Sequence, residues 1–203
     1  MTTKYIFDFQ STGSVGPDIL GGKGFGLSKM TQIGIPVPPG FVVSTDACKV
    51  FYDHGNTLTD EFWQDFDTQL TVVERQTGKK FGGSVNPLLL SVRSGAPISM
   101  PGMMDTILNI GLNDESVLAL AKSSGNRHFA FDSYRRLVQM YGEVVEGIDK
   151  RVFEGVMTLV LDKELAGSPI ELSEHGLVEL VGNFKTAFEK YVGKPFPQDP
   201  HEQ

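Results

Sequence analysis

The 203-residue sequence predicts an α+β protein. Two observations carry this prediction: short apolar strands alternate with helices before residue 112, and helical periodicity dominates after it. Glycine and proline separate the apolar runs of residues 1–112, which leaves open whether this half alone is α/β or α+β. Residues 113–203 carry apolar side chains three and four positions apart, as on one face of a helix. We therefore expect two domains, 1–112 and 113–203.

The first half is predicted to alternate between strands and helices. In residues 4–9 (KYIFDF) an alternating pattern puts Tyr5, Phe7 and Phe9 on one side, which is typical of a strand. A short helix over 24–34 and a strand within 35–45 follow, and further helices are predicted over 44–55 and 59–78, each ending at a glycine. The apolar run 88–92 predicts a strand covered on both faces, and 106–112 predicts one more strand.

The second half is predicted to be helical. Asp114 is the expected cap of its first helix, and the last helix is expected to begin at Ser173 and end at Gly193. We interpret the apolar stripes as core-facing rather than as contacts to a cofactor. The stripes are Phe131, Tyr134, Val138, Tyr141 and Val145; Phe153, Val156, Met157 and Val160; and Leu177, Val181, Phe184, Phe188 and Tyr191.

The composition excludes several classes of function. With 40% hydrophobic and 21% charged residues the chain is an ordinary globular protein. The net charge of -7 argues against nucleic acid or an anionic membrane as the main partner, but a few local cations still allow a small phosphate ligand. The sequence has no apolar stretch of membrane-spanning length. The single cysteine, Cys48, favours a cytoplasmic location, and we interpret it as a core residue rather than a nucleophile.

Two segments have the character of anion-binding sites. In residues 20–27 (LGGKGFGL), glycines allow backbone amides to approach a ligand and Lys23 supplies a charge; a structural turn before a helix is the alternative. Arg93 follows the apolar run 88–92 and presents a planar set of donors that suits phosphate oxygens; a surface salt bridge is the alternative. The adjoining residues 99–106 (SMPGMMDT) combine flexible methionines with Gly102, which suits an adaptable contact to a ligand.

Other charged groups give weaker signals. The four histidines, His54, His128, His175 and His201, lack the spacing of metal ligands. The arginines at 127, 135 and 136 are expected to pair with local acids on a solvated helix face. Residues 78–83 (GKKFGG) suit an anion or, more simply, a connecting loop.

Residues 21–48 (GGKGFGLSKMTQIGIPVPPGFVVSTDAC) and 86–114 (NPLLLSVRSGAPISMPGMMDTILNIGLND) closely resemble the N-terminal nucleotide-binding region of the pyruvate, phosphate dikinase family. Residues 129–149 (FAFDSYRRLVQMYGEVVEGID) and 195–203 (PFPQDPHEQ) are similar to the same family in the same order, so the resemblance covers nearly the whole chain. Phosphoenolpyruvate synthases share the GGK start but lack SMPGMMDT in this form.

The resemblance implies an ATP-grasp-type first subdomain, with a mixed sheet and flanking helices, and a helical second subdomain. It implies a phosphotransferase that uses ATP and Mg²⁺ to phosphorylate a carrier histidine on the way to phosphoenolpyruvate. Carried over by motif, Lys23 and Arg93 bind the ATP phosphates, Arg93 acts in catalysis, and Gly102 and Met103 belong to the loop over the phosphates. The residues agree with this, because phosphoryl transfer needs positioned cations.

The resemblance also implies parts that this chain lacks. These are the second ATP-grasp half with its acidic metal ligands, the phosphohistidine carrier domain and the phosphoenolpyruvate/pyruvate domain. We therefore expect the chain to be a fragment, inactive by itself, of an enzyme that forms a homodimer through other domains. Two alternatives stay open: the same region of a related dikinase with another acceptor, or a non-catalytic nucleotide-binding module.

Overall fold

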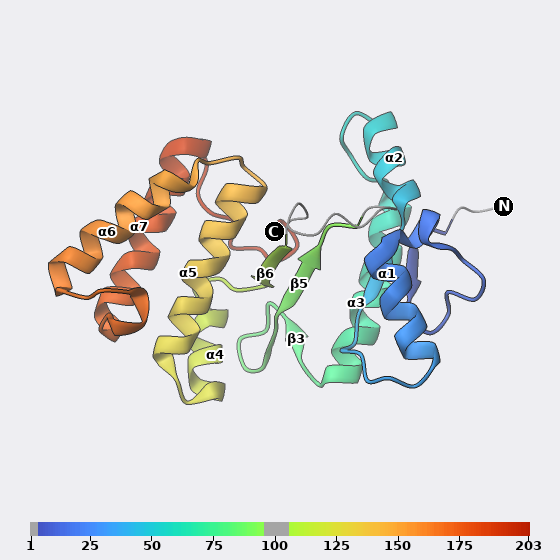
Figure 1. The fold of residues 1–203 in the computed structure, drawn as a ribbon, viewed down its shortest axis with the longest axis horizontal. Helices are drawn as coiled ribbons and strands as arrows, with labels where there is room; N and C mark the ends of the chain where they lie inside the picture. Colours follow the sequence, from blue (N-terminus) through green and yellow to red (C-terminus); the bar gives the residue numbers. More distant parts are fainter. Residues whose placement is uncertain (1–3, 96–105) are drawn as a thin grey trace. The chain divides into compact units, whose positions relative to one another are not determined.

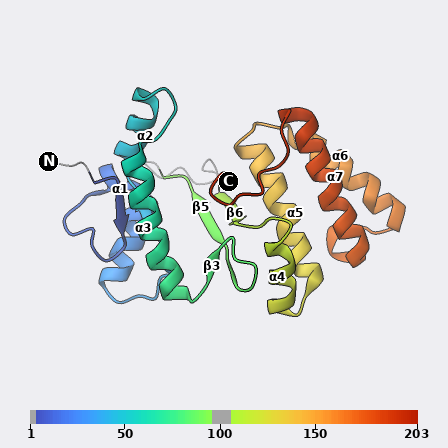
Figure 2. The same cartoon turned by 180° about the vertical axis from the view of Figure 1, so that it is seen from behind.

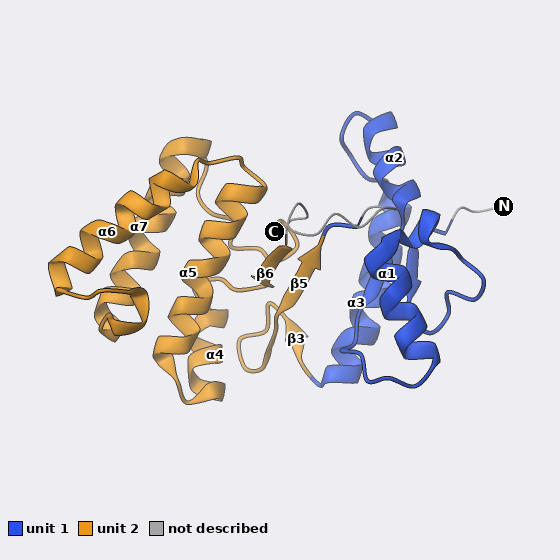
Figure 3. Ribbon diagram, in the orientation of Figure 1, with its two compact units in different colours: residues 1–78, 94–104 blue, residues 79–93, 105–203 orange. Residues whose placement is uncertain are grey.

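The computed structural model describes residues 4–95 and 106–203, and the chain forms two compact units (Figure 3). Unit 1 comprises residues 1–78 and 94–104, and unit 2 comprises residues 79–93 and 105–203. The change from strands to helices near residue 112 therefore falls inside unit 2, because the strands that precede it pack with the helices that follow. Among the helices in the described residues, none has the length and apolar character needed to cross a membrane.

Unit 1 places three helices beside one pair of strands (Figure 1). Its elements are β1 (Ile6–Asp8), α1 (Pro17–Gln32), β2 (Phe41–Val43), α2 (Thr45–Asp53) and α3 (Asp60–Thr77). β1 and β2 are antiparallel, with Phe7 opposite Val42. The predicted end of α3 is confirmed: Gly78 adopts a left-handed conformation there, and at the start the Thr59 side chain accepts a hydrogen bond from the Phe62 amide.

The core of unit 1 contains two small clusters, besides the buried Leu70 and Val73 of α3. Ile6, Ala47 and Phe62 form one, and Phe7, Leu20 and Val42 form the other. Adjacent residues of β1 thus point to opposite faces, as the alternation of the strand predicted. Cys48 is exposed, so its interpretation as a core residue was wrong; on α2 it is the neighbouring Ala47 that faces the core.

Unit 2 begins with two strand pairs. β3 (Lys80–Phe81) runs parallel to β4 (Pro87–Leu88), and β5 (Leu90–Arg93) runs antiparallel to β6 (Thr106–Ile110). The α+β class is confirmed, but the strands of the described residues form three separate pairs instead of one mixed sheet. Val92 is 51% exposed, so the expectation that its strand is covered on both faces was wrong. Pairing with β6 satisfies its backbone without covering its side chains.

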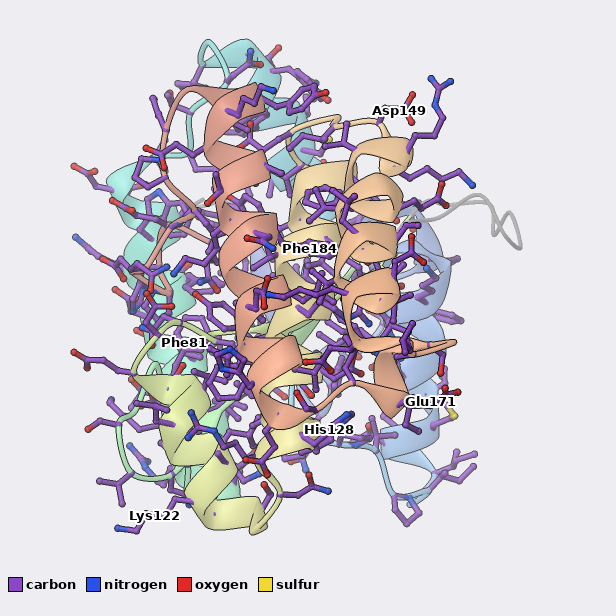
Figure 4. All side chains as sticks on the ribbon, turned by 90° about the vertical axis from the view of Figure 1, so that its left-hand side faces the viewer. Phe81, Lys122, His128, Asp149, Glu171 and Phe184 are labelled. Carbon is purple, nitrogen blue, oxygen red and sulfur yellow. The ribbon has the colours of Figure 1, made fainter. Side chains whose placement is uncertain are left out.

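The helices of unit 2 enclose one large core (Figures 1 and 2). They are α4 (Ser116–Ser124), α5 (Arg127–Val144), α6 (Lys150–Glu164), the 3₁₀ turn η1 (Pro169–Glu171) and α7 (Glu174–Val192). Figure 4 shows Phe184 between these helices, where its ring centroid lies 4.9 Å from that of Phe153. The predicted stripes face the core except at their last positions: Val145 is 50% exposed and Tyr191 is 59% exposed.

The termini of the unit 2 helices follow the expected signals with one change. Ser173 caps α7 by accepting a hydrogen bond from the Gly176 amide, and Gly193 ends that helix in a left-handed conformation, as predicted. At α4, however, Asn113 rather than Asp114 accepts from the helix amides, at 2.7 Å from the Ser116 nitrogen. Asp114 instead accepts hydrogen bonds from Tyr134 and Lys185.

The last ten residues pack against the helices and strands of unit 2, to which they belong. Phe196 is 2% exposed within the helical core. The Gln203 side chain accepts a hydrogen bond from the Gly111 amide at 2.8 Å and donates one to the Leu112 carbonyl at 2.9 Å. Gln198 accepts from the Asp114 amide. These hydrogen bonds join the segment after α7 to the turn between β6 and α4, so the segments that precede and follow the four helices in sequence are in contact.

Candidate functional site

The glycine-rich segment lies within α1, although a loop followed by a helix was expected. The helix begins at Pro17, and Gly21 interrupts it with φ 67° and ψ 161°. Such a positive φ favours glycine, because a side chain there meets the backbone. Lys23 therefore lies in the first turn of a new helical segment, where backbone amides have no partner within the helix. The kink at Gly21 thus creates a helix N-terminus beside Lys23, although the expected loop before a helix is absent here.

Gly24 has a different role from Gly21. A Cβ added at Gly24 would lie 2.8 Å and 2.9 Å from the two methyl carbons of Val42. Glycine therefore allows α1 to pack closely on β2 at the residue next to Lys23. The Thr45 hydroxyl donates a hydrogen bond to the Asp18 carbonyl at 2.7 Å and joins the start of α2 to the start of α1. The segment is thus held by backbone approach and by hydrogen bonds.

Lys23 is half-buried, and no hydrogen bond or ion pair of its amine is found in the part of the chain that the structure describes. Arg93 is exposed at the end of β5, opposite Thr106 of β6. The salt bridge considered as its alternative role is likewise not found among residues 4–95 and 106–203. Lys23 belongs to unit 1 and Arg93 to unit 2. Gly102 and Met103 lie outside the described residues.

Unit 1 brings together the backbones that flank the two predicted motifs. A Cβ placed on Gly95 would lie 4.0 Å from the Cα of Gly21. Gly95 is two residues after Arg93, and Gly21 is two residues before Lys23. Both glycines belong to unit 1, so this proximity is a property of that unit alone.

Sequence reasoning missed a buried polar network beside this segment. Thr12 is 3% exposed and Ser28 is 1% exposed, and their hydroxyls are hydrogen-bonded. The Ser28 hydroxyl donates to the Phe9 carbonyl at 2.9 Å, and the Gln32 amide donates to the Thr12 oxygen at 2.9 Å. Ser28 and Gln32 of α1 follow Thr12 by 16 and 20 residues. Because these side chains are small or polar and far apart in sequence, no periodic pattern predicted their contact.

The loop that supplies Thr12 is fixed by the carboxylate at the end of β1. Asp8 accepts hydrogen bonds from the amides of Gln10 and Ser11, each at 2.8 Å, and one from the Ser11 hydroxyl. Burial acts to raise the pKa of Asp8, but the hydrogen bonds from Ser11 and Gln10 outweigh it and hold the pKa below its ordinary value. The turn is therefore most stable with Asp8 ionised.

The three arginines of α5 have acidic partners. Arg135, 7% exposed, pairs with Asp132 at 2.8 Å, and Arg136 pairs with the same carboxylate at 2.8 Å. Arg127 lies 3.8 Å from Glu174. The pairing expected for these arginines is thus confirmed, although Arg135 is buried rather than solvated. Residues 80–81 of the GKKFGG segment form β3.

The residues that the structure describes do not form a magnesium site. In residues 4–95 and 106–203 the structure contains no group of three or more histidine, cysteine, aspartate or glutamate side chains that could hold a metal ion.

Comparison with known proteins identifies relatives over nearly the whole sequence. A family profile described as "Pyruvate phosphate dikinase, AMP/ATP-binding domain" matches residues 17–69. The chain is 43% identical over 198 residues to a pyruvate, phosphate dikinase of Entamoeba histolytica, covering 98% of this chain and 22% of the relative. It is 43% identical to that of Clostridium symbiosum, covering 98% and 23%. It is 44% identical to the chloroplastic enzyme 1 of Zea mays, covering 100% and 22%. The chain thus spans less than a quarter of these relatives.

Proposed function

We propose that this chain is the N-terminal AMP/ATP-binding region of a pyruvate, phosphate dikinase and that Lys23 and Arg93 hold the phosphates of ATP in it. The profile match over residues 17–69 and the relatives that are 43% identical support this proposal. The observation that carries this proposal is the position of Lys23, half-buried in the first turn of the helical segment after Gly21, where backbone amides have no partner within the helix; Arg93 is proposed on the family resemblance of its motif. The absence of ion-pair partners for both cations in the described residues also supports it. Gly102 and Met103 are proposed to cover the phosphates.

The chemistry follows from the charges. When a histidine nitrogen attacks a phosphorus of ATP, the phosphorus–oxygen bond to the leaving group breaks and negative charge moves onto the leaving oxygen. A guanidinium at Arg93 and an ammonium at Lys23 offset this charge without moving a proton, since both are cations at neutral pH. Arg93 is the proposed catalytic residue because its planar donors can bind two phosphate oxygens together.

The whole protein is proposed to be a pyruvate, phosphate dikinase. In this proposal the region has the ATP-grasp fold and Mg²⁺ is held by acidic residues outside it. The phosphoryl group passes to a carrier histidine of the same enzyme and then to pyruvate, which gives phosphoenolpyruvate. A cytoplasmic location and a homodimer formed by other domains belong to the same proposal. The 203-residue chain alone would bind ATP weakly and would not turn over, because half a cleft buries only part of a ligand.

The test is phosphohistidine formation from ATP in the full-length protein. Arg93→Ala should abolish it, and Lys23→Ala should weaken ATP binding by about 1.5–3 kcal/mol, the range for a hydrogen bond to a charged group. Lys29→Ala is the matched control for Lys23, on the same helix, and Arg136→Ala is the control for Arg93 in unit 2. An Arg93→Ala protein that is phosphorylated as fast as the unchanged protein would refute the catalytic role.

A further inference from the structure

The hydrogen bonds around Ser28 form a directed chain. The single hydroxyl proton of Ser28 is donated to the Phe9 carbonyl, so the Thr12 hydroxyl must be the donor in the bond between Thr12 and Ser28. Gln32 in turn donates to Thr12. Both hydroxyl protons of this hydrogen-bond network, those of Thr12 and Ser28, are therefore donated. A network in which all members are satisfied fixes the groups that carry it, because each replacement leaves a buried polar atom without a partner.

The bond from Ser28 to Phe9 is unusual for a helix. A serine inside a helix commonly bonds to the carbonyl four residues earlier, as the neighbouring Thr31 does with Leu27 at 2.9 Å. Ser28 instead reaches a carbonyl 19 residues earlier, just beyond β1. The hydroxyl therefore does not serve the helix that contains it. It ties α1 to the loop that leaves the strand pair.

A second contact, at Gly24, restrains the same helix four residues before Ser28. Gly24 lets α1 approach Val42 of β2. Ser28 lies four residues further, about one helical turn, and therefore on the same side of the helix. The two contacts together fix the depth of α1 on the strand pair and its rotation about its own axis. Lys23, the residue before Gly24, is carried with that helix.

We propose that Thr12 and Ser28 are positioning residues that set Lys23 at the phosphates of ATP. This inference rests on the proposed role of Lys23. The hydroxyls do not touch the nucleotide; they determine where the helix places the cation. Their loss would shift α1 on the strands, and losing a hydrogen bond to a charged group lowers affinity by roughly ten- to a hundredfold.

The experiment titrates the 203-residue chain with ATP and with adenosine, following amide signals by NMR, which measures weak binding. Ser28→Ala and Thr12→Val should each lower the affinity for ATP about tenfold and leave that for adenosine unchanged, because adenosine has no phosphate for Lys23 to bind. Thr12→Ser restores the hydroxyl and should restore ATP affinity. Should Ser28→Ala not fold, Thr12→Val and Thr12→Ser still decide the question.

Two controls separate positioning from general loss of stability. Thr31→Ala removes a hydroxyl from the same helix that bonds only within it. Ser116→Ala removes an equally buried hydroxyl, 0% exposed, from unit 2. Both should keep the ratio of the two affinities. A fall in that ratio with either control as large as with Ser28→Ala would overturn the inference.

A double variant shows whether Ser28 acts through Lys23. If it does, Lys23→Ala combined with Ser28→Ala should bind ATP no more weakly than Lys23→Ala alone. Additive losses would reject the positioning role while leaving the proposed function intact. If Lys23→Ala itself leaves ATP affinity unchanged, the phosphate role of Lys23 fails, and this outcome differs from the failure of the inference.

Discussion

The two units of this chain are stabilised in different ways. Unit 2 has one continuous core that includes Tyr134, Phe153, Phe184 and Phe196, all at most 2% exposed. In the described residues of unit 1, by contrast, the buried apolar groups are divided among two clusters of three residues each and the pair Leu70 and Val73 of α3. Close backbone packing and the network at Ser28 supplement these clusters. A glycine-rich segment leaves few side chains for packing, so its unit depends more on hydrogen bonds and close contacts.

The sharpest way to break this comparison is to empty the core of unit 2. Phe184→Ala should lower the free energy of unfolding by about 3–5 kcal/mol, the usual cost of removing a buried phenylalanine ring. Hydrogen exchange should show lost protection in α5, α6 and α7, with little change in α1 and β1. Tyr191→Ala, on the same helix but exposed, should cost under about 0.5 kcal/mol. Equal loss of protection in both units would contradict the distinction.

The next largest effect is expected in α1, from a pair of glycines. Gly24→Ala should destabilise unit 1 by about 1–3 kcal/mol, since its methyl group would overlap Val42. Gly26→Ala meets nothing within 4 Å and should stabilise the helix by up to about 1 kcal/mol. Thermal unfolding of both variants tests this, and adding Val42→Ala should recover part of the loss at Gly24. Destabilisation by both substitutions would show that close packing is not the cause.

The smallest effect is expected from the ionisation of Tyr134, which makes the stability of unit 2 depend on alkaline pH. Burial raises the pKa of Tyr134, and Asp114 adds to this, while the hydrogen bond from Gln198 opposes it. The phenol thus stays protonated in the folded state at a pH where the unfolded state, with an ordinary pKa of about 10, has lost the proton. Stability should be unaffected below pH ~10 and fall above it. Tyr134→Phe should cost about 1–2 kcal/mol at neutral pH for the lost hydrogen bonds and flatten this alkaline decline. An unchanged decline in denaturation midpoints would assign it elsewhere.

Sequence signals predicted the elements that local chemistry determines. The helix that ends at Gly78 and the one that begins at Ser173 have the expected bounds, because a cap or a left-handed glycine fixes a terminus by itself. The start of α1 was missed by seven residues, from 24 to 17. Glycine clusters indicate turns, and no local signal separates Gly21, which breaks the helix, from Gly24, which packs inside it.

The residues of the proposed site come from the sequence, whereas the contacts that support them appear only in the structure. Lys23 and Arg93 were proposed because charged groups next to glycines or at strand ends are recognisable in sequence, and their role stays a prediction. The pairing of Ser28 with Phe9 depends on a fold-level contact, and the exposure of Val92 depends on what covers its strand. Neither property is encoded in a short window of residues.

The position of two unique residues has a practical consequence. The chain has one tryptophan, Trp63, and one cysteine, and both lie in unit 1, the cysteine exposed. Tryptophan emission and a dye attached to the thiol therefore report on the glycine-rich half without any substitution. Energy transfer from Trp63 to the dye measures the distance between α3 and α2, on which the two residues lie. Adding ATP to the unsubstituted protein then shows whether this distance changes.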